Sequence, residues 1–104
     1  MATSKEALAA VLERLRLVPE LTFRPMMGET LLYAGGRLFG GVYDGRLLVK
    51  PTASALRMLP EAPHVSPYPG AKEMLLVNND ADPVTLAELV AAMLPELSPP
   101  KRRK

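Results

Sequence analysis

Three basic side chains, Arg24, Lys50 and Lys72, are the residues of this sequence best placed to do chemistry. Lys50 ends an apolar run typical of a strand, and Lys72 follows Pro69-Gly70-Ala71 just before another such run. Cations that converge bind phosphate or carboxylate through charge-assisted hydrogen bonds. The alternative is that each pairs with a nearby carboxylate or lies over apolar surface. Charged residues near strand ends are mostly structural, which favours the second alternative.

Other chemistry-bearing residue types are sparse. The sequence has no cysteine and a single histidine, His64, which lies among prolines and is expected to be solvated. Metal sites need several clustered ligands, so we expect no metal, no cofactor and no enzyme activity. Met26, Gly28 and Tyr68 are added to the three cations as candidate binding residues, because methionine and tyrosine adapt to varied partners.

The positive charge is concentrated at the C-terminal end. The chain of 104 residues has a formal net charge of +2, and four of its thirteen basic residues are Lys101, Arg102, Arg103 and Lys104. Without them the chain is mildly acidic. We expect residues 99–104 to be a disordered, solvated tail after a single domain over residues 1–98. The alternative is that the tail attracts nucleic acid weakly.

No apolar run is long enough to cross a bilayer, and the N-terminus does not resemble a signal peptide. The absence of cysteine fits a reducing compartment. The sequence therefore predicts a cytoplasmic protein with no membrane partner.

Helices are expected near both ends. From Thr3 to about Leu17, apolar residues recur with helical spacing, and Thr3 with Glu6 has the spacing of a capping box. Thr52 is predicted to cap a short helix that reaches about Leu59, and Asp82 a C-terminal helix with Pro83 at its first position. The C-terminal helix is expected to bury Leu86, Leu89, Val90, Met93 and Leu97. The segment from Pro60 to Pro69 has four prolines and predicts an extended loop.

Between these helices the sequence predicts an antiparallel meander. Strands are expected over Thr22–Met27, Thr30–Ala34, Arg37–Tyr43 and Arg46–Lys50, with another over Glu73–Val77. Gly35-Gly36 and Asp44-Gly45 are typical of two-residue turns. If both turns have two residues, Leu32 pairs with Phe39, and Phe39 pairs with Lys50.

Side-chain alternation along these strands then sorts residues into two faces. One predicted face holds Leu31, Tyr33, Leu38, Val42, Leu47 and Val49, and the other holds Leu32, Phe39, Tyr43, Leu48, Arg46 and Lys50. Neither face is polar throughout, so helices or a second subunit should cover both, which keeps a homodimer open. Gly40-Gly41 in mid-strand indicates a bulge or the close approach of another backbone.

Several short motifs together resemble the TfoX N-terminal domain family. They are Arg24-Pro-Met-Met-Gly28, Gly40-Gly-Val-Tyr-Asp44, Leu48-Val-Lys-Pro-Thr52 and Pro67-Tyr-Pro-Gly-Ala-Lys72. The sequence is most similar to short single-domain members. The resemblance implies an α+β fold with a central antiparallel sheet flanked by helices. Larger members carry a second domain and regulate natural competence in bacteria together with a cyclic-AMP receptor protein.

These observations predict a small regulatory or adaptor domain that acts by contact with a protein partner. Its contact surface is expected around Arg24–Gly28, the Lys50 strand end and the Pro60–Lys72 loop. Two alternatives stay open. One is a module that binds or transforms an anionic small molecule with Arg24, Lys50 and Lys72, and the other is a nucleic-acid accessory protein that uses the basic tail.

Overall fold

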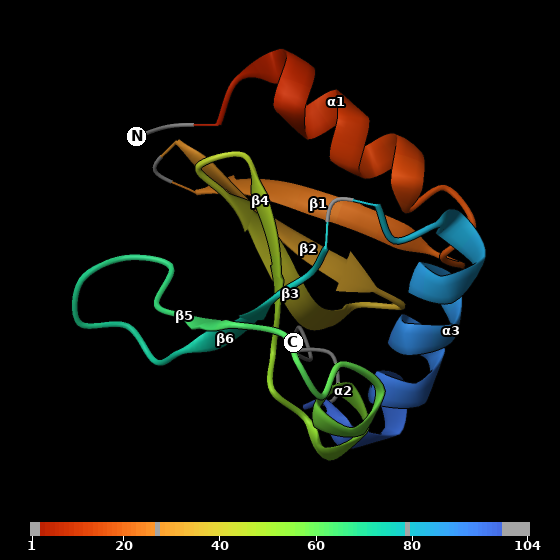
Figure 1. Ribbon diagram of the computed structural model, residues 1–104. Helices are drawn as coiled ribbons and strands as arrows, with labels where there is room; N and C mark the ends of the chain where they lie inside the picture. The colour runs from red at the N-terminus through yellow and green to blue at the C-terminus, as the bar shows by residue number, and fades with distance from the viewer. Residues whose placement is uncertain (1–2, 27, 79, 99–104) are drawn as a thin grey trace, which may run out of the picture.

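The fold is α+β, as predicted: an antiparallel sheet flanked by an N-terminal and a C-terminal helix (Figure 1). The computed structural model describes residues 3–26, 28–78 and 80–98. The elements are α1 (Lys5–Arg14), β1 (Leu21–Met26), β2 (Glu29–Ala34), β3 (Arg37–Tyr43), β4 (Arg46–Val49), α2 (Ala53–Met58), β5 (His64–Val65), β6 (Met74–Leu76), α3 (Pro83–Met93) and the 3₁₀ helix η1 (Leu94–Glu96). The strand order is β1-β2-β3-β4-β6-β5.

The cap of the N-terminal helix lies one residue later than predicted. Ser4, not Thr3, is the N-cap, because its Oγ accepts the backbone N–H of Ala7 at 3.1 Å. The predicted capping box is therefore wrong. The Thr3 hydroxyl instead donates to Glu29 at 2.8 Å and accepts the N–H of Gly45 at 3.0 Å, which joins the chain before α1 to two turns of the sheet.

The caps of the other two helices are confirmed. Thr52 accepts the N–H of Ala55 at 3.1 Å, and Asp82 accepts the N–H of Thr85 at 2.7 Å. Each side chain satisfies a backbone donor that the first turn of a helix leaves free. The predicted buried stripe of the C-terminal helix, from Leu86 to Leu97, lies in the core.

Both predicted two-residue turns are present. Asp44 and Gly45 have φ values of 54° and 77°, and Gly35 and Gly36 have 58° and 82°. Positive φ at both central residues matches the twist of the strands that the turn joins. The register beside Asp44-Gly45 is as predicted, with Val42 opposite Leu47.

The register between β2 and β3 departs from the prediction at a bulge. Tyr33 pairs with Leu38 as expected, but Leu32 pairs with Gly40, so Phe39 is an extra residue on β3. Phe39 is fully buried in the core. The Lys50 N–H still donates to the Phe39 carbonyl at 2.9 Å, yet the Lys50 side chain lines a cavity outside the core. The predicted Phe39–Lys50 side-chain pairing on one face is therefore wrong.

The bulge also regroups the two predicted faces, because a shift of one residue reverses the face of every side chain beyond it. The face toward the helices, here called the core face, carries Leu32, Phe39, Val42, Leu47 and Val49. The opposite face, here called the outer face, carries Leu31, Tyr33, Leu38, Tyr43, Arg46, Leu48 and Lys50.

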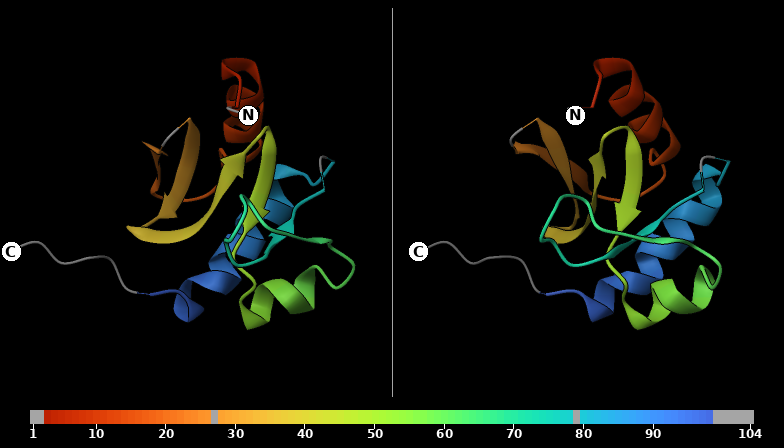
Figure 2. Two further views of the ribbon diagram at one scale, coloured as in Figure 1. Left: turned by 90° about the vertical axis from the view of Figure 1, so that its left-hand side faces the viewer. Right: turned by 60° about the vertical axis from the view of Figure 1, so that its left-hand side comes forward.

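The core forms where α1, α2 and α3 pack on the core face. Val11 and Leu15 come from the N-terminal helix and its end, Ala55 from α2, and Leu89 and Met93 from α3. Figures 1 and 2 show the loop between β5 and β6 projecting on the side of the molecule away from α3. The loop therefore lies over part of the outer face.

The Pro60–Pro69 segment is not wholly a loop. His64 and Val65 form β5, which pairs with Leu75 and Met74 of β6. Two of the three residues between Pro63 and Pro67 form this edge strand, since proline is tolerated where no ladder donor is needed.

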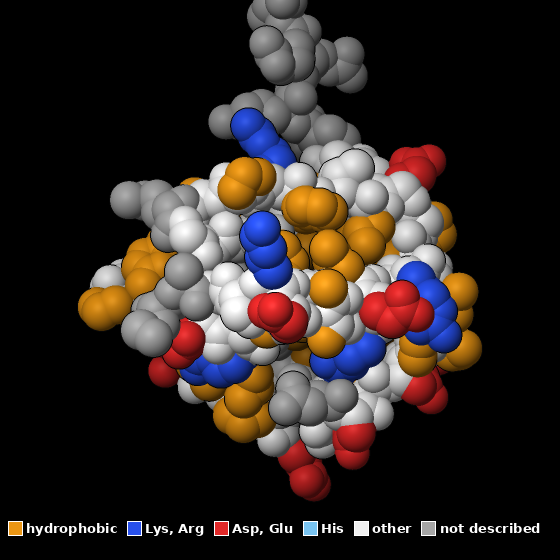
Figure 3. Space-filling model, turned by 90° about the horizontal axis from the view of Figure 1, so that it is seen from above, with side chains coloured by type: hydrophobic (Ala, Val, Ile, Leu, Met, Phe, Trp, Pro, Cys, Tyr) orange, Lys and Arg blue, Asp and Glu red, His pale blue; other side chains and the backbone are white. Residues whose placement is uncertain are grey.

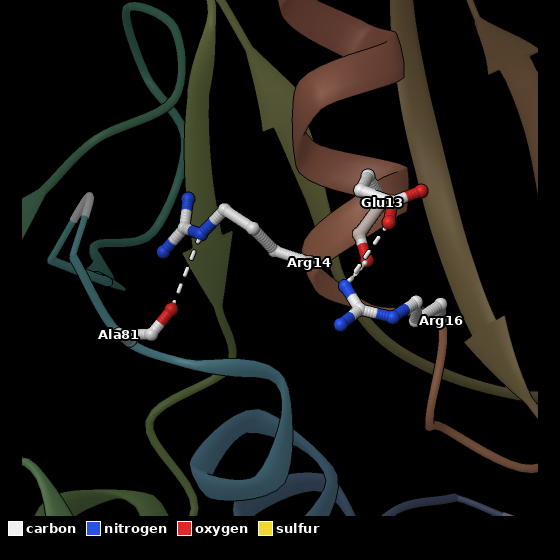
Figure 4. A network of polar contacts seen from close by, with 4 residues as sticks. All are labelled: Glu13, Arg14, Arg16 and Ala81. Atoms are coloured by element: carbon white, nitrogen blue, oxygen red, sulfur yellow. Dashed lines mark hydrogen bonds and ion pairs between the residues drawn. The ribbon is translucent and has the colours of Figure 1, made fainter.

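Arg14 ties the end of α1 to the chain before α3. Its Nε donates to the Ala81 carbonyl at 3.3 Å, and another guanidinium nitrogen donates to the Asn78 carbonyl at 2.6 Å. Arg16 instead forms an ion pair of 3.1 Å with Glu13 (Figure 4). No helix in the described part of the chain is both long and apolar enough to cross a membrane. The predicted tail, residues 99–104, lies outside the described residues.

Candidate functional site

An open cavity of about 640 Å³ lies between the outer face and the β5–β6 loop. Its walls come from β3, from the chain after β4, from the loop and from η1. The lining residues are Leu38, Gly40, Tyr43, Lys50, Pro51, Thr52, Pro67, Tyr68, Ala71, Lys72, Glu73, Met74 and Glu96. A volume of this size suits a small organic ligand. We call it the outer cavity.

Two adjacent glycines of β3 lie at the outer cavity: Gly40 lines it, and Gly41 lies beneath the ring of Tyr43. A Cβ on Gly41 would lie 2.7 Å from Cε1 of Tyr43, so the tyrosine ring packs directly over this backbone. A Cβ on Gly40 would collide with the carbonyl oxygen of Leu48 on β4. The bulge and the close backbone approach indicated by Gly40-Gly41 are therefore both present.

Tyr43 is a buried polar residue of the outer cavity, with 5% of its surface exposed. Burial raises the pKa of its hydroxyl, and the nearby Tyr68, Glu29 and Tyr33 raise it further. The group therefore stays protonated at neutral pH and offers a neutral hydrogen-bond donor. The candidate binding residues chosen from the sequence do not include Tyr43, whose neighbours on the outer face depend on the bulge.

Lys50 and Lys72 line the outer cavity from two separate segments. Within the described residues, neither ammonium group lies within 4.0 Å of a carboxylate oxygen. Two nearby carboxylates make other contacts. Glu29 accepts hydrogen bonds from Thr3 and from the Asp44 N–H, and Glu73 lies 3.9 Å from His64.

Arg24 does not join the two lysines. It is exposed on β1, at the sheet edge farthest from β5 and β6. Met26 ends the same strand and Gly28 follows it with a φ of 88°, so these three candidates lie together but away from the outer cavity. The structure brings together Lys50, Tyr68 and Lys72.

Glu96 is a cavity residue that the sequence did not reveal. One carboxylate oxygen accepts the Ser54 hydroxyl at 2.6 Å and the other accepts the Ser54 N–H at 2.9 Å. These bonds lower the pKa of Glu96, and Thr52 and Arg57 contribute to the lowering. The pair holds η1 against the start of α2. Its members are 42 residues apart, and no local pattern joins them.

The remaining sequence candidates fall outside the outer cavity. In the described part of the chain, no three His, Cys, Asp or Glu residues cluster as metal ligands. The basic tail residues Lys101–Lys104 lie outside the described ranges. Figure 3 shows the molecule from the α1 side. On this face acidic, basic and apolar side chains are interspersed, and charges of one sign do not gather in a single patch.

The chain is similar to a known protein. No family model and no solved structure matches the chain. A protein of Spirochaeta aurantia, named the uncharacterized 12.7 kDa protein in the trpE 5′ region, is 33% identical over 84 residues. The alignment covers 75% of this chain and 71% of the relative.

Proposed function

The chain belongs to the family of the 12.7 kDa Spirochaeta aurantia protein, and we propose that it is a small regulatory domain that binds an anionic small molecule in the outer cavity. The relative's name states no activity, so the proposal rests on the site itself.

The observation that carries it is the pair of lysines. Lys50 and Lys72 reach one cavity from segments that are distant in sequence, and neither has a carboxylate partner among the described residues. The lining also holds two carboxylates: Glu96 accepts hydrogen bonds from Ser54, and Glu73 lies 3.9 Å from His64. An anion that reaches both ammonium groups would gain charge-assisted hydrogen bonds.

Binding suits this site better than catalysis. Thr52 is committed to capping α2, and the Tyr43 hydroxyl has a raised pKa, which makes it a poor nucleophile at neutral pH. The resemblance to the TfoX N-terminal domain family supports a regulatory role. A link to competence and a cytoplasmic location are part of the same proposal.

The adaptor function predicted from sequence stays a prediction. The fold divides its expected contact surface, because Arg24–Gly28 lies at the β1 edge and Lys50 lies with the Pro60–Lys72 loop at the outer cavity. A protein partner, a homodimer and nucleic-acid binding by the tail are likewise untested predictions.

Thermal unfolding with added anions tests the proposal. Phosphate or sulfate, added at constant ionic strength, should raise the melting temperature of the wild type, because a ligand of the folded state stabilises it by mass action. At ten times the dissociation constant the gain is about 1.4 kcal/mol. Lys50→Ala and Lys72→Ala should each lose most of the rise.

Arg24→Ala is the matched control, since it removes an exposed cation outside the outer cavity. It should keep the full anion-dependent rise. Two results would contradict the proposal that the outer cavity binds anions. One is a wild-type melting temperature that neither anion changes, and the other is an equal rise in all variants.

A further inference from the structure

The outer cavity has an apolar part beside its cationic part. Leu38 and Tyr43 contribute from β3, Met74 from β6 and Pro67 with Tyr68 from the loop. An inorganic anion at Lys50 and Lys72 would leave most of a cavity of about 640 Å³ filled with water against this apolar surface. Burying such surface under an apolar ligand group is favourable, at about 25 cal/mol per Å².

Two tyrosines line the outer cavity, one from the sheet and one from the β5–β6 loop. Tyr43 is fixed on the sheet over Gly41, and Tyr68 comes from the loop with 54% of its surface exposed. The loop is closed on itself, because the Ala71 N–H donates to the Tyr68 carbonyl at 3.1 Å and the Ser66 hydroxyl donates to the Ala71 carbonyl at 3.2 Å. Tyr68 is therefore held at the cavity by an ordered turn and is still free to cover a ligand.

Resting on the proposed function, we propose that the ligand is a small aromatic acid. Its ring lies beside Tyr68 and Tyr43, and its carboxylate or phosphate group lies at Lys50 and Lys72. Aromatic pairs favour offset or edge-to-face contact and gain about 0.5–1.5 kcal/mol beyond their buried area. Charge and apolar surface on neighbouring walls of one cavity match an amphiphilic anion better than an inorganic one.

The experiment compares pairs of probes that share a charged group. Affinities are measured by calorimetric titration for phenyl phosphate against inorganic phosphate, and for benzoate against acetate and cyclohexanecarboxylate. The aromatic member should bind about five- to tenfold more tightly than its inorganic or acetate partner. The better of phenyl phosphate and benzoate identifies the acidic group.

Tyr68 variants separate stacking from simple filling of the cavity. Tyr68→Ala should abolish most of the aromatic gain, measured as the ratio of the affinities of the variant for phenyl phosphate and for inorganic phosphate. Tyr68→Phe should keep the gain, since it keeps the ring.

The outcomes separate this inference from the proposed function. Phosphate that binds with no further gain from a phenyl group would overturn the aromatic acid and keep the anion site. Cyclohexanecarboxylate binding as tightly as benzoate would overturn the aromatic preference, and so would an unchanged gain in Tyr68→Ala. If none of the anions binds, the anion site itself is lost.

Discussion

At the scale of single residues, polar side chains accept hydrogen bonds from backbone N–H groups and from hydroxyl groups elsewhere in the chain. Glu96 is the clearest case, because its carboxylate accepts both the hydroxyl and the N–H of the buried Ser54. Hydrogen bonds to the charged form of a carboxyl group lower its pKa. The contact therefore makes the stability of the fold depend on pH.

We predict that Glu96→Gln reduces this dependence. The folded-state pKa of Glu96 lies below its usual value of 4.5, so its contribution is present above that value and is lost as the pH falls through the folded pKa. Urea unfolding between pH 7 and pH 3 should show a lower stability of the variant at pH 7 and a shallower decline below pH 4.5.

Asp82→Asn is the matched comparison, since asparagine caps a helix without titrating. The hydrogen bond from the Thr85 N–H also lowers the pKa of Asp82. Asp82→Asn should therefore keep most of the stability at pH 7 and show a smaller loss of stability as the pH falls. Parallel pH profiles for the wild type and Glu96→Gln would contradict the role given to Glu96.

At the scale of elements, the decisive feature is the bulge at Phe39-Gly40. It turns Phe39 into the core and leaves Leu38, Tyr43 and Lys50 on the outer face. Without the extra residue, Tyr43 and Lys50 would lie on the opposite face of the sheet from Leu38. Gly40 allows the bulge because β3 and β4 approach too closely there for any side chain.

We therefore predict that Gly40→Ala destabilises the protein by about 3 kcal/mol or more, because the new methyl group meets the backbone of Leu48 and lies 2.9 Å from Cα of Val49. Gly70→Ala is the control. Its Cβ has no neighbour within 4 Å, and only its φ of +87° opposes the substitution, at about 1–2 kcal/mol. Equal losses in chemical denaturation would show that the contact with β4 is not limiting.

At the scale of the whole molecule, long-range contacts join segments that no local pattern connects. Arg14 joins α1 to the chain before α3, and Arg37 donates to the carbonyls of Leu94 and Leu97 at the end of the C-terminal helix. Thr3 joins the N-terminus to the β3–β4 turn. These contacts fix the helices on the core face and so leave the outer face to the loop.

We predict that Arg14→Leu lowers the free energy of unfolding by about 1–2 kcal/mol, because it removes charged donors from two backbone carbonyls. Arg16→Ala removes only an exposed ion pair with Glu13 and should cost less than about 0.5 kcal/mol. Figure 4 shows Arg14 extending toward Ala81 and Arg16 extending toward Glu13. If urea titrations give the two variants the same stability, the link from α1 to Ala81 is not structural.

The sequence by itself determined the features that depend on neighbouring residues. Asp44-Gly45 and Gly35-Gly36 specified their turns, Thr52 and Asp82 specified their helix starts, and apolar spacing specified the buried stripe of α3. Each of these acts over a few residues, so local chemistry is sufficient to predict it.

Only the tertiary structure decided which of these residues meet. The sequence indicated a bulge near Gly40 but not that Phe39 was the extra residue, and every face assignment depends on that position. The sequence grouped Arg24 with Lys50 and Lys72, but Arg24 lies at the other edge of the sheet, because strand order is not encoded locally. The bond between Ser54 and Glu96 requires α2 and η1 to pack first, so no spacing in the chain predicts it.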